Sequence, residues 1–300
     1  MRDDARVQAH LIDGTYELFR HHMGLPSEVA ASSPRAATRG VVGSVLDLLE
    51  QGATHVGVAT DTVIESFRND LWPGYKTGAG IEPALKDQFP LVERALESLG
   101  VTVWGMVEVE ADDALATAAA RLAADPAVER VVICTPDKDL AQCVTGERVI
   151  QHDRRHGTFR DEAGVWERFG VAPASIPDYL ALVGDSADGF PGLPGWGAKS
   201  AATVLARYGR IDAIPDDPGA WDVTVRGAAR LAETLAGSRD AAELFRVLAT
   251  LRDDVAGVAE DGMEALRWTG PRDDFADTCA ALDAPGIGER AAALAERRRA

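Results

Sequence analysis

Nine carboxylates in this 300-residue sequence stand in short acidic motifs, most of them beside the predicted end of a strand or start of a helix. No histidine or cysteine joins them as a candidate ligand. Ligands made only of oxygen favour hard ions such as Mg²⁺ or Mn²⁺ over zinc. Two such ions about 4 Å apart suit phosphodiester cleavage, because one activates water and the other stabilises the leaving oxygen. The nine candidates are Asp13, Asp61, Glu110, Asp112, Asp113, Asp137, Asp139, Asp185 and Asp188.

Asp13 and Asp61 each follow an apolar run that is typical of a buried strand. Ligands of an open α/β sheet bind at the carboxyl ends of its parallel strands, so both side chains are expected at one crevice. A single aspartate in such a position is more often a turn or N-cap residue. Each of the two is therefore weak evidence for a metal site when taken alone.

Two further acidic motifs strengthen the case. Glu110-Ala111-Asp112-Asp113 places three acids within four residues at the start of a predicted helix. Helix capping explains one of these acids, but the crowding of all three is unfavourable unless cations neutralise it. The pair in Asp137-Lys138-Asp139 follows another strand run, and such a pair is shared by turns, phosphatases and many metal enzymes.

A glycine-rich segment joins the last two acids to a predicted helix. Asp185 and Asp188 lead into Pro194-Gly195-Trp196-Gly197-Ala198-Lys199, which is typical of a helix-hairpin-helix element. Its glycines allow backbone N–H groups to approach a phosphate at the helix start. The simpler interpretation, that glycine and proline merely break two helices, explains one Pro-Gly pair but not the whole motif.

The elements that must position these residues alternate in the first half of the chain, as in a parallel or mostly parallel α/β sheet. From about residue 162 onward, short helices joined by Pro/Gly turns are expected. Surface or irregular connections are expected over Pro26–Arg39 and Thr62–Ile81. Predicted strands cover Val7–Ile12, Thr54–Ala59, Val101–Trp104, Arg130–Cys134 and Arg148–Gln151; predicted helices cover Val41–Glu50, Leu85–Leu99, Ala111–Ala123, Val165–Phe169, Ile176–Val183, Lys199–Tyr208, Gly227–Leu235 and Ala241–Arg252.

Composition indicates an ordinary globular protein, with 46% hydrophobic and 26% charged residues. The sequence carries neither a signal peptide nor a membrane span, so we expect a cytoplasmic protein. Its three cysteines have no metal-binding spacing and are expected to be reduced thiols. The net charge of −17 argues on its own against binding nucleic acid, and bound cations would offset part of it.

Taken together, the motifs resemble the 5′-nuclease superfamily of flap endonucleases and 5′–3′ exonucleases, which includes the N-terminal domain of bacterial DNA polymerase I. The resemblance runs from Leu11-Ile12-Asp13-Gly14 to about Leu282 and includes Ser66-Phe67-Arg68, Gly74-Tyr75-Lys76 and Asp137-Lys138-Asp139-Leu140-Ala141-Gln142. It implies a PIN-like α/β domain over residues 1–168 with a mostly parallel sheet. A helical domain with an H3TH-type helix-hairpin-helix would cover 169–285, and a C-terminal tail 286–300.

The resemblance also implies a role for each site residue. Asp13, Asp61, Glu110 and Asp112 would hold a first ion, and Asp137, Asp139 and Asp188 a second, both Mg²⁺ or Mn²⁺. Asp113 and Asp185 would stand behind these ligands. Lys76 would lie near the scissile phosphate and, with Arg68, form the catalytic cations. The expected DNA contacts are Arg20, Tyr75, Gly192, Gly195, Gly197, Lys199 and Ser200, with a K⁺ ion at the hairpin.

The implied substrate is DNA with 5′ ends, flaps or nicks, cleaved by a stand-alone monomeric nuclease. The chain departs from the family pattern after Lys76: Thr77-Gly78-Ala79-Gly80-Ile81-Glu82 lacks the usual basic arch. Two alternatives stay open at this point. One is a structure-specific DNA-binding protein without catalysis, and the other is a PIN-type ribonuclease, which the hairpin disfavours because it suits a duplex backbone.

Overall fold

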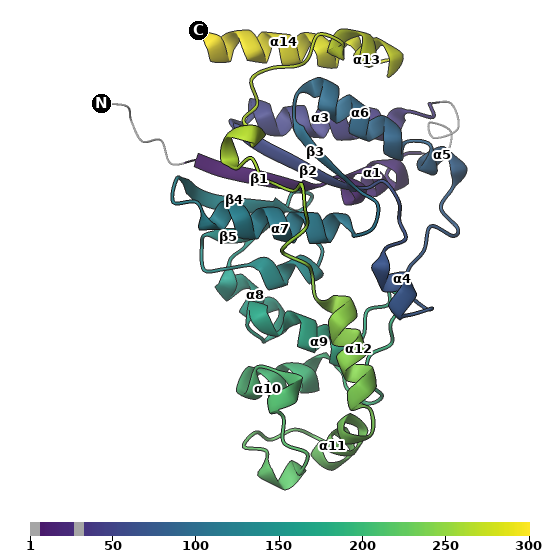
Figure 1. Cartoon of the computed structure of the whole chain (residues 1–300), viewed down its shortest axis with the longest axis vertical. Coiled ribbons are helices and arrows are strands. Elements are labelled where there is room, and N and C mark those ends of the chain that lie inside the picture. Colours follow the sequence, from purple (N-terminus) through teal and green to yellow (C-terminus); the bar gives the residue numbers. More distant parts are fainter. Residues whose placement is uncertain (1–6, 27–32) are drawn as a thin grey trace. The chain divides into compact units, whose positions relative to one another are not determined.

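The computed structural model describes residues 7–26 and 33–300, which form two compact units. The first, called the sheet unit, comprises residues 7–26, 33–64, 78–135 and 253–300 among those described. The second, called the helical unit, comprises Glu65–Thr77 and Pro136–Arg252. Each unit has its own core, and Figure 1 labels the helices and strands of both units.

Four parallel strands form the centre of the sheet unit, in the order β3-β2-β1-β4. They are β1 (Val7–Asp13), β2 (His55–Asp61), β3 (Thr102–Met106) and β4 (Val128–Cys134). The first six residues of β2 are buried, as expected of a strand covered on both faces. The register pairs Asp13 with Ala59 of β2, so that β1 and β2 end at the same edge of the sheet.

Helices cover both faces of this sheet (Figure 1). On one face lie α1 (Gly14–Met23), α3 (Ala36–Glu50) and α6 (Phe89–Leu99), which contact one another, and on the other lies α7 (Ala111–Ala124). The short α5 (Pro83–Lys86) precedes α6, and η5 (Met263–Leu266) contacts β2. Outside α6 and α3 pack α13 (Phe275–Ala281) and α14 (Pro285–Arg299).

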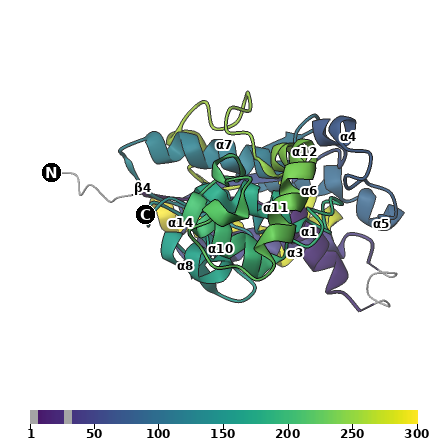
Figure 2. The ribbon, with the colours of Figure 1, turned by 90° about the horizontal axis from the view of Figure 1, so that it is seen from below.

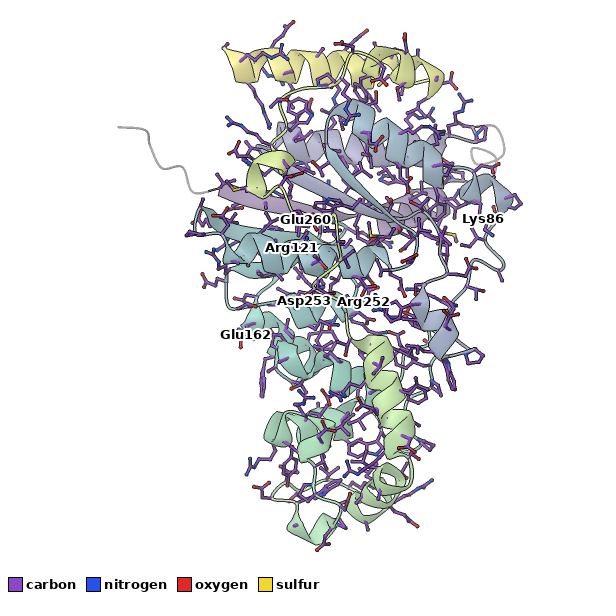
Figure 3. The ribbon with its side chains drawn as sticks, in the orientation of Figure 1. Lys86, Arg121, Glu162, Arg252, Asp253 and Glu260 are labelled. Atoms are coloured by element: carbon purple, nitrogen blue, oxygen red, sulfur yellow. The ribbon has the colours of Figure 1, made fainter. Side chains whose placement is uncertain are left out.

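Ion pairs and hydrogen bonds attach the C-terminal segment to the rest of the sheet unit. Arg121 of α7 donates to the carbonyl of Val258 and pairs with Glu260 at 3.6 Å, a contact that can be followed in Figure 3. Arg290 of α14 binds two acids of α3, Asp47 and Glu50. Residues from the two ends of the chain therefore share one unit.

The helical unit contains one antiparallel hairpin, β5 (Val149–Asp153) with β6 (Thr158–Arg160), and a set of short helices. In both views α11 lies beside α12 (Figures 1 and 2). The α-helices are α4 (Phe67–Leu71), α8 (Glu162–Phe169), α9 (Ile176–Val183), α10 (Ala198–Tyr208), α11 (Ala228–Gly237) and α12 (Arg239–Ala249). The 3₁₀ helices are η1 (Asp139–Cys143), η2 (Pro173–Ser175), η3 (Ile211–Ala213) and η4 (Pro218–Ala220).

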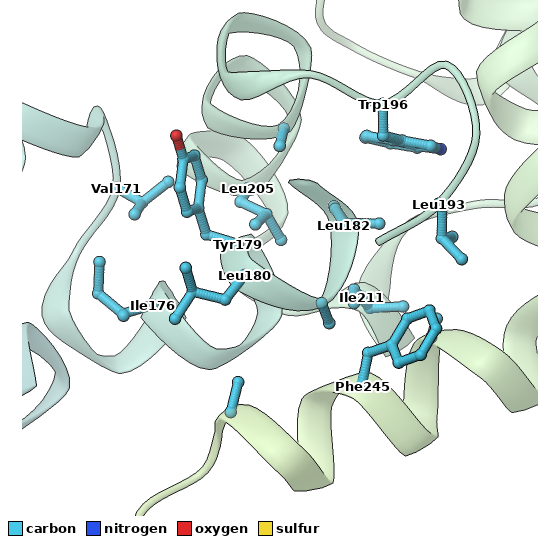
Figure 4. Close-up of a cluster of buried hydrophobic side chains, with 14 of the residues drawn as sticks. Val171, Ile176, Tyr179, Leu180, Leu182, Leu193, Trp196, Leu205, Ile211 and Phe245 are labelled. Carbon is cyan, nitrogen blue, oxygen red and sulfur yellow. The ribbon is translucent and has the colours of Figure 1, made fainter. Parts of the chain in front are cut away.

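Apolar residues from α9, α10 and α12 and from the turn between α9 and α10 form the core of the helical unit (Figure 4). Leu180 and Leu182 of α9 pack with Leu205 of α10 and Phe245 of α12. Trp196, in the turn, is 6% exposed and belongs to the same cluster. This packing fixes the helix-hairpin-helix element.

The five predicted strands are confirmed, each within two residues at either end. Four other predictions were wrong in part. The connection expected to be irregular over Thr62–Ile81 contains α4. A single helix over Leu85–Leu99 is broken at Asp87–Gln88, and the helix expected to reach Arg252 ends at Ala249. The loop expected over Pro26–Arg39 includes the start of α3 at Ala36, while its residues 27–32 lie outside the described part.

The remaining predictions concern further helices and strands, the cysteines, membrane spans and the domain borders. Helices α1, α4, α13 and α14 and strand β6 were not predicted. The three cysteines are free, and two of them, Cys134 and Cys279, are buried. No helix in the described residues is long and apolar enough to cross a membrane. The domain borders expected at 168/169 and 285/286 stay predictions.

Candidate metal centre

Asp13 ends β1 and caps the helix that follows it. Its Oδ1 accepts a hydrogen bond from the Tyr16 N–H at 2.8 Å, and its Oδ2 accepts one from the Thr135 hydroxyl at 2.9 Å. Gly14 permits this abrupt change from strand to helix, since a Cβ there would lie 2.7 Å from a side-chain carbon of Thr60. The side chain, 5% exposed, is thus held in one orientation.

Asp61 ends β2 and joins it to the start of α7. Its Oδ1 accepts from the Ala111 N–H at 2.7 Å, and its own N–H donates to the Thr15 hydroxyl at 2.8 Å. Ala111 stands between Glu110 and Asp112 in the chain, so this bond brings the acidic start of α7 to the end of β2. The ends of β1 and β2 and the acidic start of α7 therefore lie at one edge of the sheet.

Asp113 caps the start of α7. Its Oδ2 accepts from the Glu110 N–H at 3.0 Å, while its own N–H donates to the backbone carbonyl of Glu110 at 3.0 Å. Asp113 is completely buried, whereas Asp112 on the same turn is half-buried. This hydrogen bond engages Asp113 inside the protein, and its expected place behind the ligands stays a prediction.

Three acids of the helical unit form a compact group, called here the aspartate triad. Asp139, Asp185 and Asp188 are all buried, and one carboxylate oxygen from each lies within 4.8 Å of the other two. Asp139 begins η1. Asp185 and Asp188 lie in a tight turn after α9, closed by hydrogen bonds between the backbones of Asp185 and Phe190 at 2.8 and 3.0 Å.

Two lysines offset the charge of the aspartate triad. Lys138 Nζ lies 2.7 Å from Asp185 Oδ2, and Lys76 Nζ lies 2.9 Å from Asp188 Oδ1. Burial acts to lower the pKa of Lys138, but its bond with Asp185 and the charges of Asp139 and Asp137 raise it above the usual value. Lys138 was not among the site residues predicted from the sequence, although its position between two acids indicates a place in the acidic site.

The surroundings of Asp139 compensate the charge of its carboxylate only in part. Burial, followed by the charges of Asp137, Asp188 and Asp185, raises the pKa of its carboxyl well above the ordinary value. Its Oδ1 is buried without a hydrogen-bond partner among the described residues. A carboxylate oxygen in that state fits a hard divalent cation, which would supply both the missing partner and the missing charge.

The aspartate triad differs from the expected ligand set at two positions. Asp185, expected behind the ligands, is a member of the triad, while Asp137 is exposed and is not. Asp137 nevertheless lies close by, because its Oδ1 accepts from the Asp139 N–H at 3.0 Å and its charge acts on the Asp139 carboxyl. All four acids therefore belong to one neighbourhood of the helical unit.

The structure corrects the part assigned to Arg68. Its side chain is 1% exposed, with Nε bound to the Leu248 carbonyl at 2.8 Å and Nη2 to the Thr250 carbonyl at 3.1 Å. A guanidinium committed to buried carbonyls of this kind stabilises the end of α12. Arg68 therefore anchors α4 within the helical unit instead of presenting its charge to a substrate.

The three aromatic residues near the glycine-rich motifs, Trp72, Tyr75 and Trp196, are packing residues. Tyr75, expected to contact DNA, is 4% exposed and belongs to the core of the helical unit. Trp196 donates from Nε1 to the Leu231 carbonyl at 3.2 Å, and Trp72 donates to the Gly189 carbonyl and packs edge-on against Phe245. The burial of Tyr75 makes it unavailable for stacking on bases.

The hairpin exposes most, but not all, of its expected DNA contacts. Gly195, Gly197 and Lys199 are exposed, and the Ser200 hydroxyl accepts from the Gly197 N–H at 3.0 Å, which shapes the start of α10. Gly192 differs, because it is buried against the backbone at the end of α9. Its part is to let the turn close, so we remove it from the contact surface.

Arg20, in the sheet unit, lies on α1 and pairs with the buried Glu17. Its Nη2 also lies 3.1 Å from Nε2 of His21. Its side chain is 26% exposed.

Comparison with known protein families identifies the class of α/β proteins to which this fold belongs. Residues 8–170 match the N-terminal resolvase-like domain of 5′–3′ exonucleases, and residues 171–274 match their C-terminal SAM fold. The chain belongs to the 5′–3′ exonuclease family. The resemblance found in the motifs is confirmed, as is the expected sequence of a mostly parallel α/β domain and a helical domain.

Individual relatives agree with this assignment. The chain is 34% identical to a 5′–3′ exonuclease of Mycobacterium tuberculosis over 231 residues, covering 68% of this chain and 71% of that protein. It is 35% identical to DNA polymerase I of Pseudomonas aeruginosa over 256 residues, 82% of this chain and 27% of the polymerase. The chain spans about a quarter of the length of the DNA polymerase I relatives that it matches.

Among solved structures, a D15 flap endonuclease of bacteriophage T5, in complex with DNA and metal ions, has the same fold. The TM-score is 0.62 at 19% identity, covering 96% of this chain and 99% of the other. At this identity the likeness concerns the fold.

Replacing Gly192 by alanine should destabilise the protein. Its φ is +69°, and a Cβ would lie 2.3 Å from the Gly184 nitrogen and 2.6 Å from the Leu182 carbonyl oxygen, both backbone atoms. We expect Gly192→Ala to lower the free energy of unfolding by roughly 3 kcal/mol or more in urea denaturation. The matched Gly197→Ala variant, whose Cβ meets nothing within 4 Å, should lose about 1 kcal/mol at most. Equal losses would contradict this account of the turn.

Replacing Asp139 by asparagine should stabilise the metal-free protein at neutral pH. The raised pKa means that folded Asp139 keeps its proton over a pH range in which the unfolded chain has lost it. Stability should therefore fall as pH rises from the ordinary aspartate pKa toward the folded-state pKa, and asparagine should remove this dependence. Thermal unfolding in metal-free buffer from pH 4 to 8 measures the effect, with the exposed Asp240→Asn as control. A lower midpoint for Asp139→Asn at pH 7 would contradict it.

Proposed function

We propose that this chain is a divalent-metal-dependent nuclease that hydrolyses DNA as a 5′–3′ exonuclease and 5′-flap endonuclease. The observation that carries the proposal is the buried aspartate triad, with the unpartnered Oδ1 of Asp139, in a chain of the 5′–3′ exonuclease family. The M. tuberculosis relative is named a 5′–3′ exonuclease, and the T5 neighbour a flap endonuclease in complex with DNA and metal ions.

Two Mg²⁺ or Mn²⁺ ions are proposed. Carboxylates at the strand ends of the sheet unit would hold one of them: Asp13, Asp61, Glu110 and Asp112. The aspartate triad of the helical unit would hold the other, together with Asp137. When bound, such ions activate a water molecule and neutralise charge on the phosphate.

The chain's own residues orient the ligands and supply positive charge. Backbone and hydroxyl donors hold Asp13 and Asp61 in fixed positions, so their carboxylates need no rearrangement to bind an ion. Lys76, whose side chain is 32% exposed, is the proposed cation at the scissile phosphate. A cation bound by Asp188 would weaken the attraction that now holds Lys76 Nζ and leave it available for the substrate.

The exposed hairpin is the proposed grip on the DNA backbone. Gly195, Gly197, Lys199 and Ser200 surround the first turn of α10, where N–H groups and the helix dipole favour a phosphate. A K⁺ ion at this hairpin is part of the proposal. The protein is proposed to act as a monomer in the cytoplasm, on DNA with 5′ ends, flaps or nicks.

Alanine at Asp112 or Asp137 should abolish cleavage while leaving the fold largely intact. Loss of a metal-binding carboxylate removes stabilisation of the charged transition state, and we expect at least about a hundredfold slower cleavage. The assay incubates labelled 5′-flap, nicked, blunt and single-stranded DNA with Mg²⁺ or with EDTA and sizes the products. Circular dichroism checks folding.

The exposed acids Asp277 and Asp240, one in each unit, provide control variants that should cleave as the wild type does. Unchanged cleavage by Asp112→Ala and Asp137→Ala would overturn the assignment of the metal ligands. Binding of flaps without cleavage in Mg²⁺ would favour a non-catalytic DNA-binding protein. Cleavage of matched RNA but not DNA would favour a ribonuclease.

Lys199→Ala should weaken binding to duplex DNA equally for all sequences. Because a lysine that contacts a phosphate releases about one counterion, the slope of log affinity against log salt should become shallower by about one. Fluorescence anisotropy in Ca²⁺ or metal-free buffer measures this slope. Arg207→Ala, at the other end of α10 in an ion pair with Asp222, should leave the slope unchanged. A wild-type slope for Lys199→Ala would exclude this contact.

A further inference from the structure

A basic cavity lies in the sheet unit, at the edge where the strands begin. Its volume is about 650 Å³, and its lining includes Thr54, immediately before β2. The seven residues of β2 span roughly 20 Å, so the cavity is far from Asp61 at the other end of the strand. The charged and hydroxyl-bearing side chains of the lining are Thr54, Glu264, Arg267, Thr269, Arg298 and Arg299.

The walls of this cavity are fixed by hydrogen bonds. The Trp268 backbone N–H donates to the Thr54 carbonyl at 2.9 Å, and its indole Nε1 donates to the Leu99 carbonyl at 2.8 Å. Arg267 forms a backbone bridge with His55 at the start of β2. The cavity is therefore part of the folded framework, and its shape does not depend on a loose surface loop.

Arg298 contributes to the cavity a guanidinium whose hydrogen bonds are incomplete. Its guanidinium lies 5.1 Å from the centre of the Trp268 ring, and Nη2 donates to the carbonyls of Leu49 and Ala53. These two hydrogen bonds cap the carboxyl end of α3 and account for the position of Nη2. By contrast, Nη1 is buried without a hydrogen-bond partner among the described residues, and burial lowers the pKa of the side chain. The positive charge of this guanidinium at the cavity wall favours an anion in the cavity.

The other two arginines are available to the same ligand. Arg267 is paired with Glu264 at 3.5 Å, but both side chains are at least 60% exposed, and such surface pairs are weak. Arg299 is exposed, and its Nη2 lies 3.2 Å from the position that a Cβ on Gly270 would occupy. Three guanidinium groups and one carboxylate thus line a single cavity in a chain whose net charge is −17.

We propose that this cavity binds a phosphate-bearing ligand of about nucleotide size. Arginine forks match phosphate oxygens in charge and geometry, and several arginines together favour a multiply charged anion over a single carboxylate. A volume of about 650 Å³ is within the usual range of small-ligand sites. Because the cavity shares no residue with the acidic groups, this inference stands apart from the proposed nuclease activity.

The test measures binding by isothermal titration calorimetry in metal-free buffer, with pyrophosphate, a nucleoside monophosphate and a short single-stranded oligonucleotide as probes. The double variant Arg267→Gln/Arg299→Gln should bind at least one of these probes roughly tenfold more weakly than the wild type. Arg297→Gln provides the matched control, since Arg297 is exposed on α14 but does not line the cavity. Arg298 is left intact because it also anchors α14.

The probes distinguish the source of the phosphate. Weaker binding of the monophosphate identifies a free nucleotide, and weaker binding confined to the oligonucleotide identifies a nucleic-acid backbone. Equal affinities in the wild type and the double variant, or no binding of any probe at millimolar concentration, would overturn the proposal. Cleavage activity is not needed for any of these measurements, so failure of the nuclease proposal would leave them unaffected.

Discussion

Repulsion between crowded carboxylates is the constraint on which the rest of this structure depends. Acids buried close together are stable only where hydrogen-bond donors or cations compensate their charge. In the helical unit the aspartate triad has two lysines, Lys76 and Lys138, and still leaves Asp139 with a raised pKa and an unpartnered oxygen. The protein alone therefore compensates this group incompletely, which is the condition expected of a site that binds a cation.

The sheet unit meets the same constraint with backbone N–H groups. Asp13 caps helix α1, Asp113 accepts from the Glu110 N–H at the start of α7, and Asp61 accepts from the first N–H of α7. Helix N-termini stabilise negative charge, so the start of a helix lowers the free-energy cost of an acid at each strand end. The N-cap interpretation and the metal interpretation are consequently compatible. A carboxylate whose one oxygen is fixed by a helix is well oriented to offer the other to an ion.

The sequence predicts the role of a residue well when the residues that fix this role lie nearby in the chain, and poorly when they lie far away in the chain. Buried β-branched runs identify the strands, and a strand end locates Asp13 and Asp61, because both signals are local. Arg68 and Tyr75 were misjudged for the opposite reason. Arg68 is bound by carbonyls about 180 residues away in the chain, at Leu248 and Thr250, and no local pattern announces such partners. Sequence motifs identified both residues, but their burial in the folded protein determines their roles.

The acidity of the chain then limits how it can hold a polyanion. Two divalent ions carry +4, which leaves most of a net charge of −17 uncompensated, so attraction must come from local features. The loop over residues 77–82 contributes no lysine or arginine, and Lys76 is engaged by Asp188. Among the predicted DNA contacts of the helical unit, Gly195, Gly197 and Lys199 at the start of α10 stay exposed. Grip on the substrate should therefore depend on the geometry of backbone donors more than on net charge, and it should require the ions to be bound first.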